Sequence, residues 1–525
     1  MDGSAAAGAK LVEHFDVLIV GAGISGIGAA YHLQQQCPDR SFVVLEALAA
    51  SGGTWRTHRY PGIRSDSDLY TFGYRFKPWT GPPIAEGAAI LAYLDEVIAE
   101  NELEQHIRYG RRIVRAAWDS GRALWNVQAE HADSGALQTF TCNFLWMCQG
   151  YYRHAAGYTP DWPGMADYKG RIVHPQTWPQ DLDYKGKRVL LVGSGATAAT
   201  LLPAIAGDCA HVTLLQRSPT YFVPGRNANE LADQLNALDV DPAWTHEIVR
   251  RKILQDQAAF TRRAIDEPEA VKAELLAGVS AFVGPEVTAK HFTPRYRPWR
   301  QRIAFVPDGD LFQAVLSGKA SIADGEIETF TETGVRLTSG ETLDADIVIT
   351  ATGFELSVLG DIPLEVDGRP VDPADTVTYR GMMFTGVPNL VWIFGYFRAS
   401  WTLRVDLVAD FVCRLLNHMT SHGLAKVDVA LRPEDHGMPR LPWVDPEDFN
   451  PGYLTRSLAK MPSAGDKAEW RHTQDYWAER TALPAIDLDG PEFRYAGAPG
   501  DGLDAPQSPD DGARKPTMGS EPEPA

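Results

Sequence analysis

The sequence predicts an α/β protein built from two βαβ units and a helical insertion. Two glycine-rich turns, at residues 21–26 and 193–198, each follow a short apolar run of strand type and precede a helix-favouring segment. A polar, helix-favouring stretch with few strand-like runs follows the second unit at residues 220–290. A later apolar run at residues 345–350 adds a further strand.

The composition is that of a globular protein with several domains. The 525 residues suggest roughly two to four domains, and 44% hydrophobic with 22% charged residues is ordinary for a folded chain. The net charge is −19, from 49 basic and 68 acidic residues. This acidity disfavours binding to nucleic acid or to anionic membranes, which needs a basic surface. We expect no nucleic acid as a partner.

The cysteines and the apolar runs point to the cytoplasm. Five cysteines are scattered without C-x-x-C spacing, which disfavours a disulfide framework or a structural zinc site, so no metal is expected. No apolar run approaches the roughly 20 residues that cross a bilayer, and the N-terminus lacks the pattern of a signal peptide. These features predict a cytoplasmic protein without a transmembrane segment.

The first βαβ unit has the features of a Rossmann-like dinucleotide-binding domain. Gly21 permits a tight turn, Gly23 lets the backbone approach a pyrophosphate, and Gly26 allows the helix to pack closely on the strand. Glu46 ends the second strand, where a carboxylate accepts hydrogen bonds from ribose hydroxyls. The expected elements are a strand at 15–20, a helix at 27–36 and a strand at 41–45.

The second unit differs at the position that selects the cofactor. Its third glycine is replaced by Ala198, and its second strand ends in Gln216-Arg217-Ser218 without an acid. A guanidinium can pair with a 2′-phosphate that a carboxylate would repel, so NADP is favoured over NAD. The alternative is that Arg217 is a solvated surface arginine. The expected elements are a strand at 188–192, a helix at 197–205 and a strand at 211–215.

Two such units in one chain suggest a flavin that accepts hydride and a nicotinamide that donates it. The acidic first site suits FAD. A disulfide reductase would need a pair of redox cysteines near the first unit, but Cys37 stands alone. Molecular oxygen is the next candidate for the electron acceptor.

Two longer patterns lead to a family. Residues 52–66 match [AG]-G-x-W-x4-[FY]-P-[GM]-x3-D at every fixed position, and residues 168–179 match F-x-G-x3-H-x3-W-P with Tyr168 in place of Phe. Over roughly residues 14–490 the chain resembles the class B flavoprotein monooxygenases of the Baeyer–Villiger type. Within them it is most similar to the bacterial ethionamide-activating monooxygenases. That closer likeness is carried by residues 59–68, 193–198, 216–221 and 399–403.

The resemblance implies an NADPH- and O2-dependent oxygenation of apolar ketones to esters or lactones through a C4a-peroxyflavin, and also sulfoxidation of thioethers or thioamides. Arg302 matches the family's cation over the flavin, with Arg297 and Arg300 as rivals. Asp66 matches the aspartate that holds this arginine and contacts the flavin directly, although it could instead cap the helix that follows. A fixed cation would stabilise an anionic peroxide and the oxyanion formed from the carbonyl.

Further site residues follow from the same resemblance. FAD contacts are expected at Ser25, Thr54, Trp55 and Ile113. NADP contacts are expected at Gly193, Ser194, Gly195, Ala196, Thr197, Ala198, Arg217 and Ser218, with Arg64 and Ser65 approaching from the flavin side. The resemblance assigns domain coupling to His174 and Trp178, and the wall of the substrate pocket to Phe397 and Trp401. It also places the return from the NADP domain to the FAD domain at residues 351–353.

The expected domains divide the chain into seven segments. They are a flexible arm (1–14), the FAD domain (15–150 and 369–494), the NADP domain (151–222 and 301–368), a helical insertion (223–300) and a disordered acidic tail (495–525). Two alternative functions stay open. One is an N- or S-oxygenating flavin monooxygenase, and the other is a non-catalytic sensor that binds NADPH and flavin.

Overall fold

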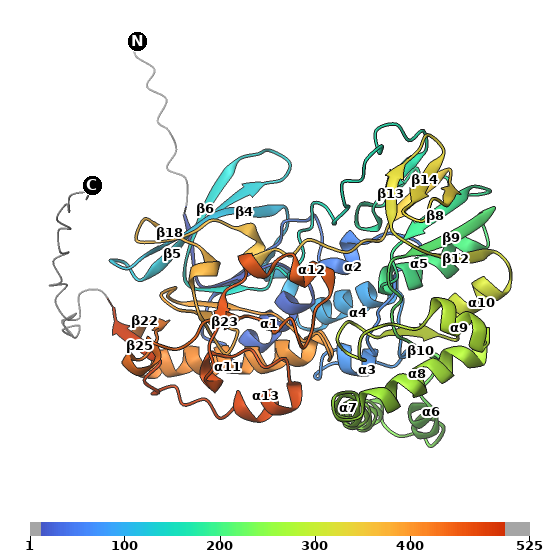
Figure 1. Ribbon diagram of the computed structural model, residues 1–525. Helices are drawn as coiled ribbons and strands as arrows, with labels where there is room; N and C mark the ends of the chain where they lie inside the picture. Colours follow the sequence, from blue (N-terminus) through green and yellow to red (C-terminus); the bar gives the residue numbers. More distant parts are fainter. Residues whose placement is uncertain (1–11, 499–525) are drawn as a thin grey trace, which may run out of the picture.

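The computed structural model describes residues 12–498, which form two lobes (Figure 1). The larger lobe contains a nine-stranded sheet in the order β18-β17-β4-β5-β6-β1-β2-β3, with β21 also pairing with β6. The smaller lobe contains a five-stranded sheet in the order β12-β9-β8-β16-β7. Most of the expected arm and tail, residues 1–11 and 499–525, lies outside the described residues.

The large sheet is a parallel unit extended by an antiparallel meander. Strands β1, β2, β3, β6 and β21 pair in parallel, whereas β4, β5 and β6 are antiparallel neighbours. The strands are β1 (Glu13–Val20), β2 (Phe42–Leu45), β3 (Ile107–Arg108), β4 (Arg111–Asp119), β5 (Leu124–His131), β6 (Leu137–Met147), β17 (Leu364–Val366), β18 (Arg369–Val371) and β21 (Leu390–Trp392).

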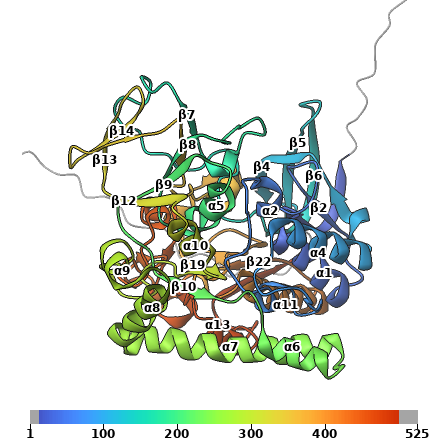
Figure 2. The same ribbon diagram turned by 90° about the vertical axis from the view of Figure 1, so that its right-hand side faces the viewer.

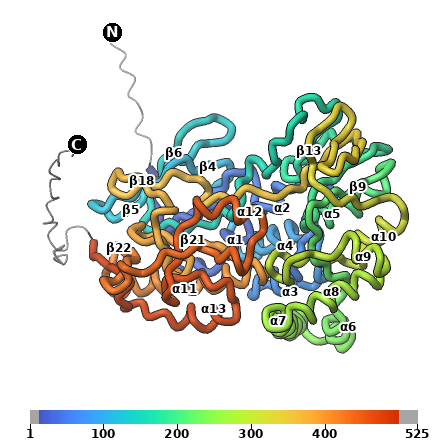
Figure 3. Tube along the Cα trace, in the orientation of Figure 1, coloured from blue at the N-terminus to red at the C-terminus, as the bar shows by residue number. Residues whose placement is uncertain are grey.

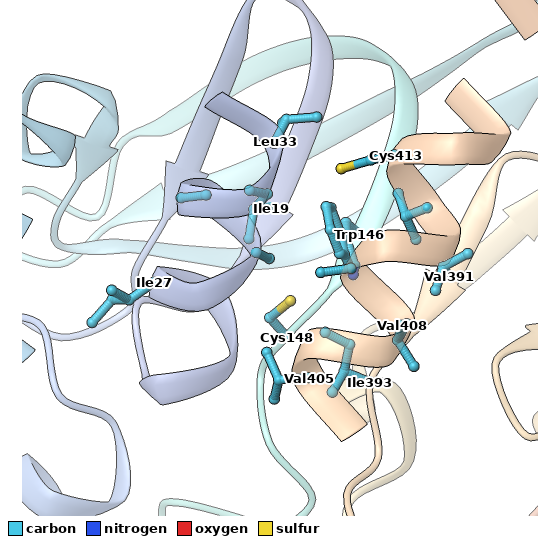
Figure 4. Close-up of a cluster of buried hydrophobic side chains, with 14 of the residues drawn as sticks. Ile19, Ile27, Leu33, Trp146, Cys148, Val391, Ile393, Val405, Val408 and Cys413 are labelled. Atoms are coloured by element: carbon cyan, nitrogen blue, oxygen red, sulfur yellow. The ribbon is translucent and has the colours of Figure 1, made fainter. Parts of the chain in front are cut away.

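Helices α1 (Ile24–Gln36) and α11 (Trp401–Ser421) pack on each other and on this sheet. Apolar side chains of both helices and of the sheet meet in one buried cluster (Figure 4). A Cβ on Gly28 would lie 2.9 Å from the Tyr74 ring and 3.0 Å from Val405, so glycine allows the helices to approach closely. Burial of these apolar faces holds the end of β1, from which the first glycine turn leaves.

The small lobe is an all-parallel sheet around the second glycine turn. Its strands are β7 (Arg171–Val173), β8 (Arg188–Val192), β9 (His211–Gln216), β12 (Ala320–Asp324) and β16 (Ile347–Thr350), and its helices are α5 (Ala196–Ala206) and α10 (Asp310–Leu316). A separate antiparallel sheet is formed by β13 (Ile327–Phe330), β14 (Gly334–Leu337) and β15 (Thr342–Asp344). The sequence predicts β8, β9 and β16 to within two residues at each end.

The expected insertion is helical, and it runs along the base of the molecule (Figures 2 and 3). Its helices are α6 (Glu230–Ala237), α7 (Pro242–Asp266), α8 (Pro268–Val283) and α9 (Pro285–His291), and they are flanked by the paired strands β10 (Phe222–Gly225) and β11 (Ala304–Pro307). Arg250 of α7 is buried and donates hydrogen bonds to the carbonyls of Tyr70, Thr71 and Gly73. The insertion is thus tied to the large lobe, although its sequence interrupts the small one.

The remaining elements complete the large lobe. They are α2 (Thr54–Thr57), α3 (Leu69–Phe72), α4 (Gly87–Glu100), α12 (Gly452–Thr455), α13 (Tyr476–Ala482), β19 (Thr378–Tyr379), β20 (Met383–Phe384), β22 (Leu424–Val429), β23 (Leu441–Pro442), β24 (Ser463–Ala464) and β25 (Phe493–Gly497). Across residues 12–498, no helix combines the length and apolarity that a bilayer crossing requires.

Three of the expected domain boundaries need correction. Strand β1 begins at Glu13, inside the expected arm, because its backbone pairs with β6 from that residue onward. Strand β25 runs to Gly497, inside the expected tail, because it pairs with β22. Strands β17 and β18 belong to the large sheet, so the chain leaves the small lobe before Leu364 and not at residue 368.

Candidate active site

A cavity of about 520 Å³ lies where the first glycine turn, the 52–66 segment and the start of α5 meet. The sequence-predicted residues that line it are Gly21, Gly23, Ser25, Glu46, Thr54, Trp55, Arg64, Ser65, Asp66, Ile113, Ala196, Thr197, Arg302 and Trp401. The predicted residues outside its lining are Gly26, Gly193, Ser194, Gly195, Ala198, Arg217, Ser218, His174, Trp178 and Phe397.

The first glycine turn leaves no room for a side chain at Gly21 or Gly26. Gly21 has φ +96°, and a Cβ there would lie 3.1 Å from the carbonyl oxygen of Cys148. A Cβ on Gly26 would lie 1.8 Å from the carbonyl oxygen of Gly21. No side chain caps the start of α1 after Gly23, and the first turn of this helix lines the cavity with its free N–H groups. This cradle of glycines and free donors fits a pyrophosphate.

Glu46 is 6% exposed and held at the edge of the cavity by two backbone donors. Its carboxylate accepts hydrogen bonds from the N–H of Ala22 at 2.6 Å and of Leu48 at 2.8 Å. Burial raises the pKa of Glu46, and these N–H groups oppose that rise. A carboxylate has about four acceptor sites, so about two remain for ribose hydroxyls.

Arg302 and Asp66 form an ion pair with two contacts in the cavity wall. Arg302 Nε lies 2.9 Å from one Asp66 carboxylate oxygen, and Nη2 lies 3.2 Å from the other. Burial disfavours the guanidinium charge, but the Asp66 carboxylate and the nearby tyrosines outweigh it and raise the pKa of Arg302. The pairing predicted from the sequence motif is present, and it gives the cavity a permanent, fixed cation.

The rival arginines point elsewhere. Arg297 pairs with Asp448 at 2.6 Å, and Arg300 pairs with the exposed Glu447 at 2.8 Å. Neither of the two lines the cavity. Of the three candidates, the structure therefore brings Arg302 alone into the site.

The 52–66 segment also reaches the small lobe. A Cβ on Gly62 would lie 2.6 Å from the Cβ of Ala204, so this glycine lets the segment rest on α5. Arg64, expected to approach NADP, pairs with Asp310 at 2.5 Å and also faces the cavity. One motif thus bridges the two nucleotide-binding units.

Tyr60 strengthens this bridge from the cavity side. Its ring packs in the core of the small lobe, and its hydroxyl lies near Thr197 at the start of α5. Burial raises the pKa of Tyr60, and the hydrogen bond with Thr197 opposes that rise. The phenol therefore stays uncharged between the two units.

The second glycine turn is open at Gly195, although a Cβ on Gly193 would lie 2.3 Å from the carbonyl oxygen of Ala351. Nothing lies within 4 Å of a Cβ built on Gly195. The Ser194 hydroxyl donates to the carbonyl of Ser218 at 2.6 Å, which ties the turn to the end of β9. Arg217 is 80% exposed, and its Nε lies 3.9 Å from a carboxylate oxygen of Glu326. The exposed guanidinium of Arg217 is therefore accessible to a phosphate group from solvent. The Glu326 carboxylate beside it competes for the same charge.

His174 lies where two connections pass between the lobes. The connections are bonded to each other through their backbones, with the N–H of Arg153 donating to Glu355 and that of Tyr158 to Gly353. The His174 ring nitrogen Nε2 lies 3.0 Å from the carbonyl oxygen of Gly353. Burial lowers the pKa of His174, and this hydrogen bond opposes the shift.

The ring of His174 also fills the space beside the first connection. A Cβ on Gly157 would lie 1.9 Å from that ring, so the histidine packs directly on the 150–158 connection. Trp178, four residues on, lies edge-on to Tyr184 at a centroid distance of 6.1 Å and packs on the core of the small lobe. These contacts place His174 between the lobes and Trp178 at the side of one.

Of the two residues predicted to form the substrate wall, Trp401 lines the cavity and Phe397 does not. The indole N–H of Trp401 donates to the Ser25 hydroxyl at 2.8 Å. Phe397 is 2% exposed and stacks on Phe449 at a centroid distance of 4.7 Å, away from the cavity. The expectation that Phe397 lines the pocket is therefore corrected: the ring is a core residue, enclosed by its aromatic neighbours.

Sequence reasoning misses Tyr151, Tyr152 and Tyr396, which also line the cavity. A signal for the first two is available, because they follow the end of β6, and ligands of parallel sheets bind at the carboxyl ends of strands. Tyr396 follows the end of β21, which pairs in parallel with β6, so the same signal applies to it. Within residues 12–498 no group of three metal-ligating side chains is present.

Comparison with known proteins agrees with this site. Residues 19–83 match the family model of the NAD(P)-binding Rossmann-like domain, and residues 80–230 match that of flavin-binding monooxygenase-like proteins. The FAD-containing monooxygenase EthA of Mycobacterium tuberculosis is 44% identical over 493 residues, which cover 93% of this chain and 99% of the relative. The chain belongs to the FAD-containing monooxygenase family.

Further relatives and solved structures are similar to this monooxygenase. A probable FAD-binding monooxygenase, AlmA, of an Acinetobacter species is 43% identical over 90% of this chain and 94% of the relative. An oxidized steroid monooxygenase bound to NADP has a TM-score of 0.72 at 23% identity and covers 92% of this chain and 100% of that chain. An open structure of cyclohexanone monooxygenase has a TM-score of 0.72 at 19% identity, over 93% and 100% of the two chains. The predicted α/β fold with two Rossmann-like domains is confirmed.

Proposed function

We propose that this monooxygenase uses NADPH and O2 to convert apolar ketones to esters or lactones, a Baeyer–Villiger oxidation with FAD as its resident cofactor. The observation that carries the proposal is the Arg302–Asp66 pair, which faces the same cavity as the first glycine turn. A non-catalytic sensor would have no use for a cation fixed at that place.

The first unit fits FAD. The glycine cradle and the start of α1 would hold the pyrophosphate, and Glu46 would hold a ribose. Thr54 and Trp55 would border the ring system, since both face the cavity together with Asp66. When bound, FAD supplies the redox chemistry that accepts hydride and activates dioxygen.

The second unit fits NADPH. The start of α5, with Ala196 and Thr197, reaches the cavity and would present its N–H groups to the pyrophosphate. Arg217 and Ser218 at the end of β9 would bind the 2′-phosphate. The remaining residues of the turn, Gly193, Ser194, Gly195 and Ala198, would hold the start of α5 in place beside the pyrophosphate.

Arg302 would stabilise negative charge on the reacting oxygens. Asp66 holds the guanidinium through two contacts, which fix its direction before substrate arrives. The surrounding cavity surface is largely apolar, so the charge acts through little water and favours an uncharged ketone over an ionised substrate.

We also propose that His174 couples the motions of the two domains. Its ring contacts both connections between the lobes, at Gly157 and Gly353, so a movement of one connection is passed to the other. Trp178 would fix the same segment to the small lobe.

The experiment is a product analysis with purified holoenzyme, NADPH, O2 and linear, cyclic and aryl ketones, with a thioether in parallel. We expect esters or lactones. Arg302→Ala should lower ester formation by about 100-fold or more, because one preorganised stabiliser of an oxyanion is typically worth that much. Flavin reduction by NADPH, followed anaerobically, should persist in this variant.

The matched control is Arg300→Ala, which removes an arginine two positions away that pairs with an exposed glutamate. It should keep ester formation within about threefold of wild type, since surface ion pairs contribute little. Sulfoxide or N-oxide as the sole product, with no ester from any ketone, would assign the chain to the rival class of oxygenations.

A further inference from the structure

Two adjacent tyrosines line the same cavity as Arg302. Tyr151 and Tyr152 directly follow the turn after β6, and their hydroxyl groups hydrogen-bond to each other. The Tyr151 ring stacks on Trp401 at a centroid distance of 4.8 Å and an angle of 14°. The Tyr152 ring packs on Phe354 at 4.2 Å. Both rings are thus held in place by aromatic neighbours.

A count of donors and acceptors leaves the Tyr151–Tyr152 pair with one donor too many. A guanidinium carries only donors, so Arg302 offers the phenols no acceptor, and the Asp66 carboxylate bonds to Arg302 and Ser67, not to either phenol. Each phenol has one O–H, and the bond between Tyr151 and Tyr152 uses one of the two. Among residues 12–498, neither hydroxyl has an acceptor other than its partner. One O–H therefore remains for a group that enters the cavity.

The uncommitted O–H keeps its proton at neutral pH. Burial raises the pKa of Tyr151 and of Tyr152, and the nearby Arg302 charge opposes the rise without reversing it. The pair therefore stays a donor, and it adds no charge of its own to the site. A ligand that suits it must bring an acceptor oxygen close to Arg302.

We propose that the Tyr151–Tyr152 pair donates its free O–H to the oxygen of the substrate carbonyl, and so shares with Arg302 the negative charge that develops there. This inference rests on the proposed function and adds a second oxyanion donor to it. No proton is transferred in the step: the O–H bond stays intact, and the hydrogen bond shortens as the carbonyl oxygen becomes an alkoxide. The hydroxyl that donates within the pair orients the other one, so both tyrosines contribute.

The test uses Tyr151→Phe and Tyr152→Phe, which keep the rings and remove one hydroxyl each. FAD content and thermal stability should match the wild type. We expect kcat for ester formation to fall by about 10- to 100-fold, because a hydrogen bond to a charged oxygen is typically worth that much. The KM for the ketone should change less than kcat, since the bond strengthens as charge develops. The rate of flavin reduction by NADPH should match that of wild type.

Tyr453→Phe is the matched control. Tyr453 is a third phenol in the electrostatic surroundings of Arg302, but it is outside the cavity lining. An equal loss of kcat in Tyr453→Phe would show that the phenols act only through the surroundings of Arg302, and it would overturn the proposal. Unchanged kcat in both Tyr151→Phe and Tyr152→Phe would overturn it as well.

A binding measurement separates this inference from the proposed function. Calorimetry on the oxidised holoenzyme would compare a ketone with the hydrocarbon of the same shape. We expect wild type to bind the ketone more tightly, and the two phenylalanine variants to lose most of that difference. If wild type forms no ester but shows this binding difference, the proposed function fails and the donor assignment stands. If the variants bind the ketone as wild type does and keep its kcat, the donor assignment fails alone.

Discussion

The two glycine turns have almost the same backbone but different surroundings. Gly23 and Gly195 both precede their helix with φ near −80° and ψ −173°. The first turn is enclosed, with Glu46 6% exposed behind it, whereas the second is followed by Arg217, which is 80% exposed. The same motif thus lies once inside the molecule and once at its surface.

The difference teaches how one chain can treat two dinucleotides differently. A ligand on the first turn is surrounded by protein, so its release requires the lobes to separate or the chain to open. A ligand on the second turn keeps one side in solvent and can exchange freely. We therefore expect FAD to stay bound through many turnovers and NADPH to exchange in each one.

The largest expected effect is a contrast between Gly26→Ala, at the tightest position of the first turn, and Gly195→Ala, at the most open position of the second; the residue equivalent to Gly26 in the second turn is already Ala198. The first substitution puts a Cβ 1.8 Å from a backbone oxygen, so we expect a loss of bound FAD and of stability by about 3 kcal/mol. The second meets no atom within 4 Å, so stability and FAD content should hold, while KM for NADPH rises because the backbone can no longer approach the pyrophosphate. Thermal unfolding would measure the stability of the two variants, and flavin absorbance would measure their FAD content. Equal tolerance of the two alanines would contradict the comparison.

A smaller effect concerns selection of NADPH at the exposed turn. Arg217→Ala should raise KM for NADPH about tenfold or more and leave KM for NADH unchanged, because NADH has no 2′-phosphate to lose a partner. Glu326→Gln should lower KM for NADPH, since it removes the carboxylate 3.9 Å from Arg217 Nε. Steady-state kinetics with NADPH and with NADH would measure these changes in KM. An equal change for NADPH and NADH in Arg217→Ala would exclude the 2′-phosphate contact.

The smallest effect concerns the tie between the insertion and the large lobe. His246 of α7 accepts a hydrogen bond from the N–H of Trp79 at 3.0 Å, and burial lowers its pKa from 6.5 to about 4. Between these two values the unfolded chain binds a proton that the folded chain rejects. This contribution to stability is therefore present above about pH 6.5 and is lost as the pH falls toward 4.

Denaturant unfolding at a series of pH values would measure this dependence. Between about pH 7 and about pH 5.5, we expect His246 to remove about 1 kcal/mol of unfolding free energy. His246→Gln, which keeps a polar group but does not titrate, should flatten the curve by that amount. His58, whose pKa burial also lowers to about 4, acts in the same range and stays in both proteins, so the difference reports His246. Parallel curves for the two proteins would contradict the assignment.

The sequence predicts most of what depends on local pattern. Both glycine turns, the strands before and after them and the helical insertion follow from the spacing of apolar residues and glycines, which acts over a few residues. The Arg302–Asp66 pair joins residues far apart in the chain, and it is predictable because a long motif identifies Asp66 and its surroundings.

The features that the sequence does not predict depend on packing between distant segments. Phe397 is a bulky apolar residue of the kind that lines substrate pockets. In the structure Phe449, from a distant segment, stacks on its ring and separates the ring from the cavity. Tyr151 and Tyr152 share a cavity with Arg302 only because the chain returns there after the insertion. The sequence places the end of the small lobe too late because β17 pairs with β4, more than about 200 residues earlier, and no local pattern reports that pairing.

The paired connections between the lobes limit how the molecule can move. Because residues 150–158 and 351–356 are hydrogen-bonded to each other, they form a two-stranded ribbon in place of two independent tethers. Such a ribbon bends readily across its face but resists bending within its plane, so it acts as a hinge with one axis. We therefore expect the small lobe to swing about this axis, which changes the distance from its glycine turn to Arg302. This hinge acts together with the 52–66 segment, which packs Tyr60 in the core of the small lobe and pairs Arg64 with Asp310, so the position of the small lobe is guided at two places.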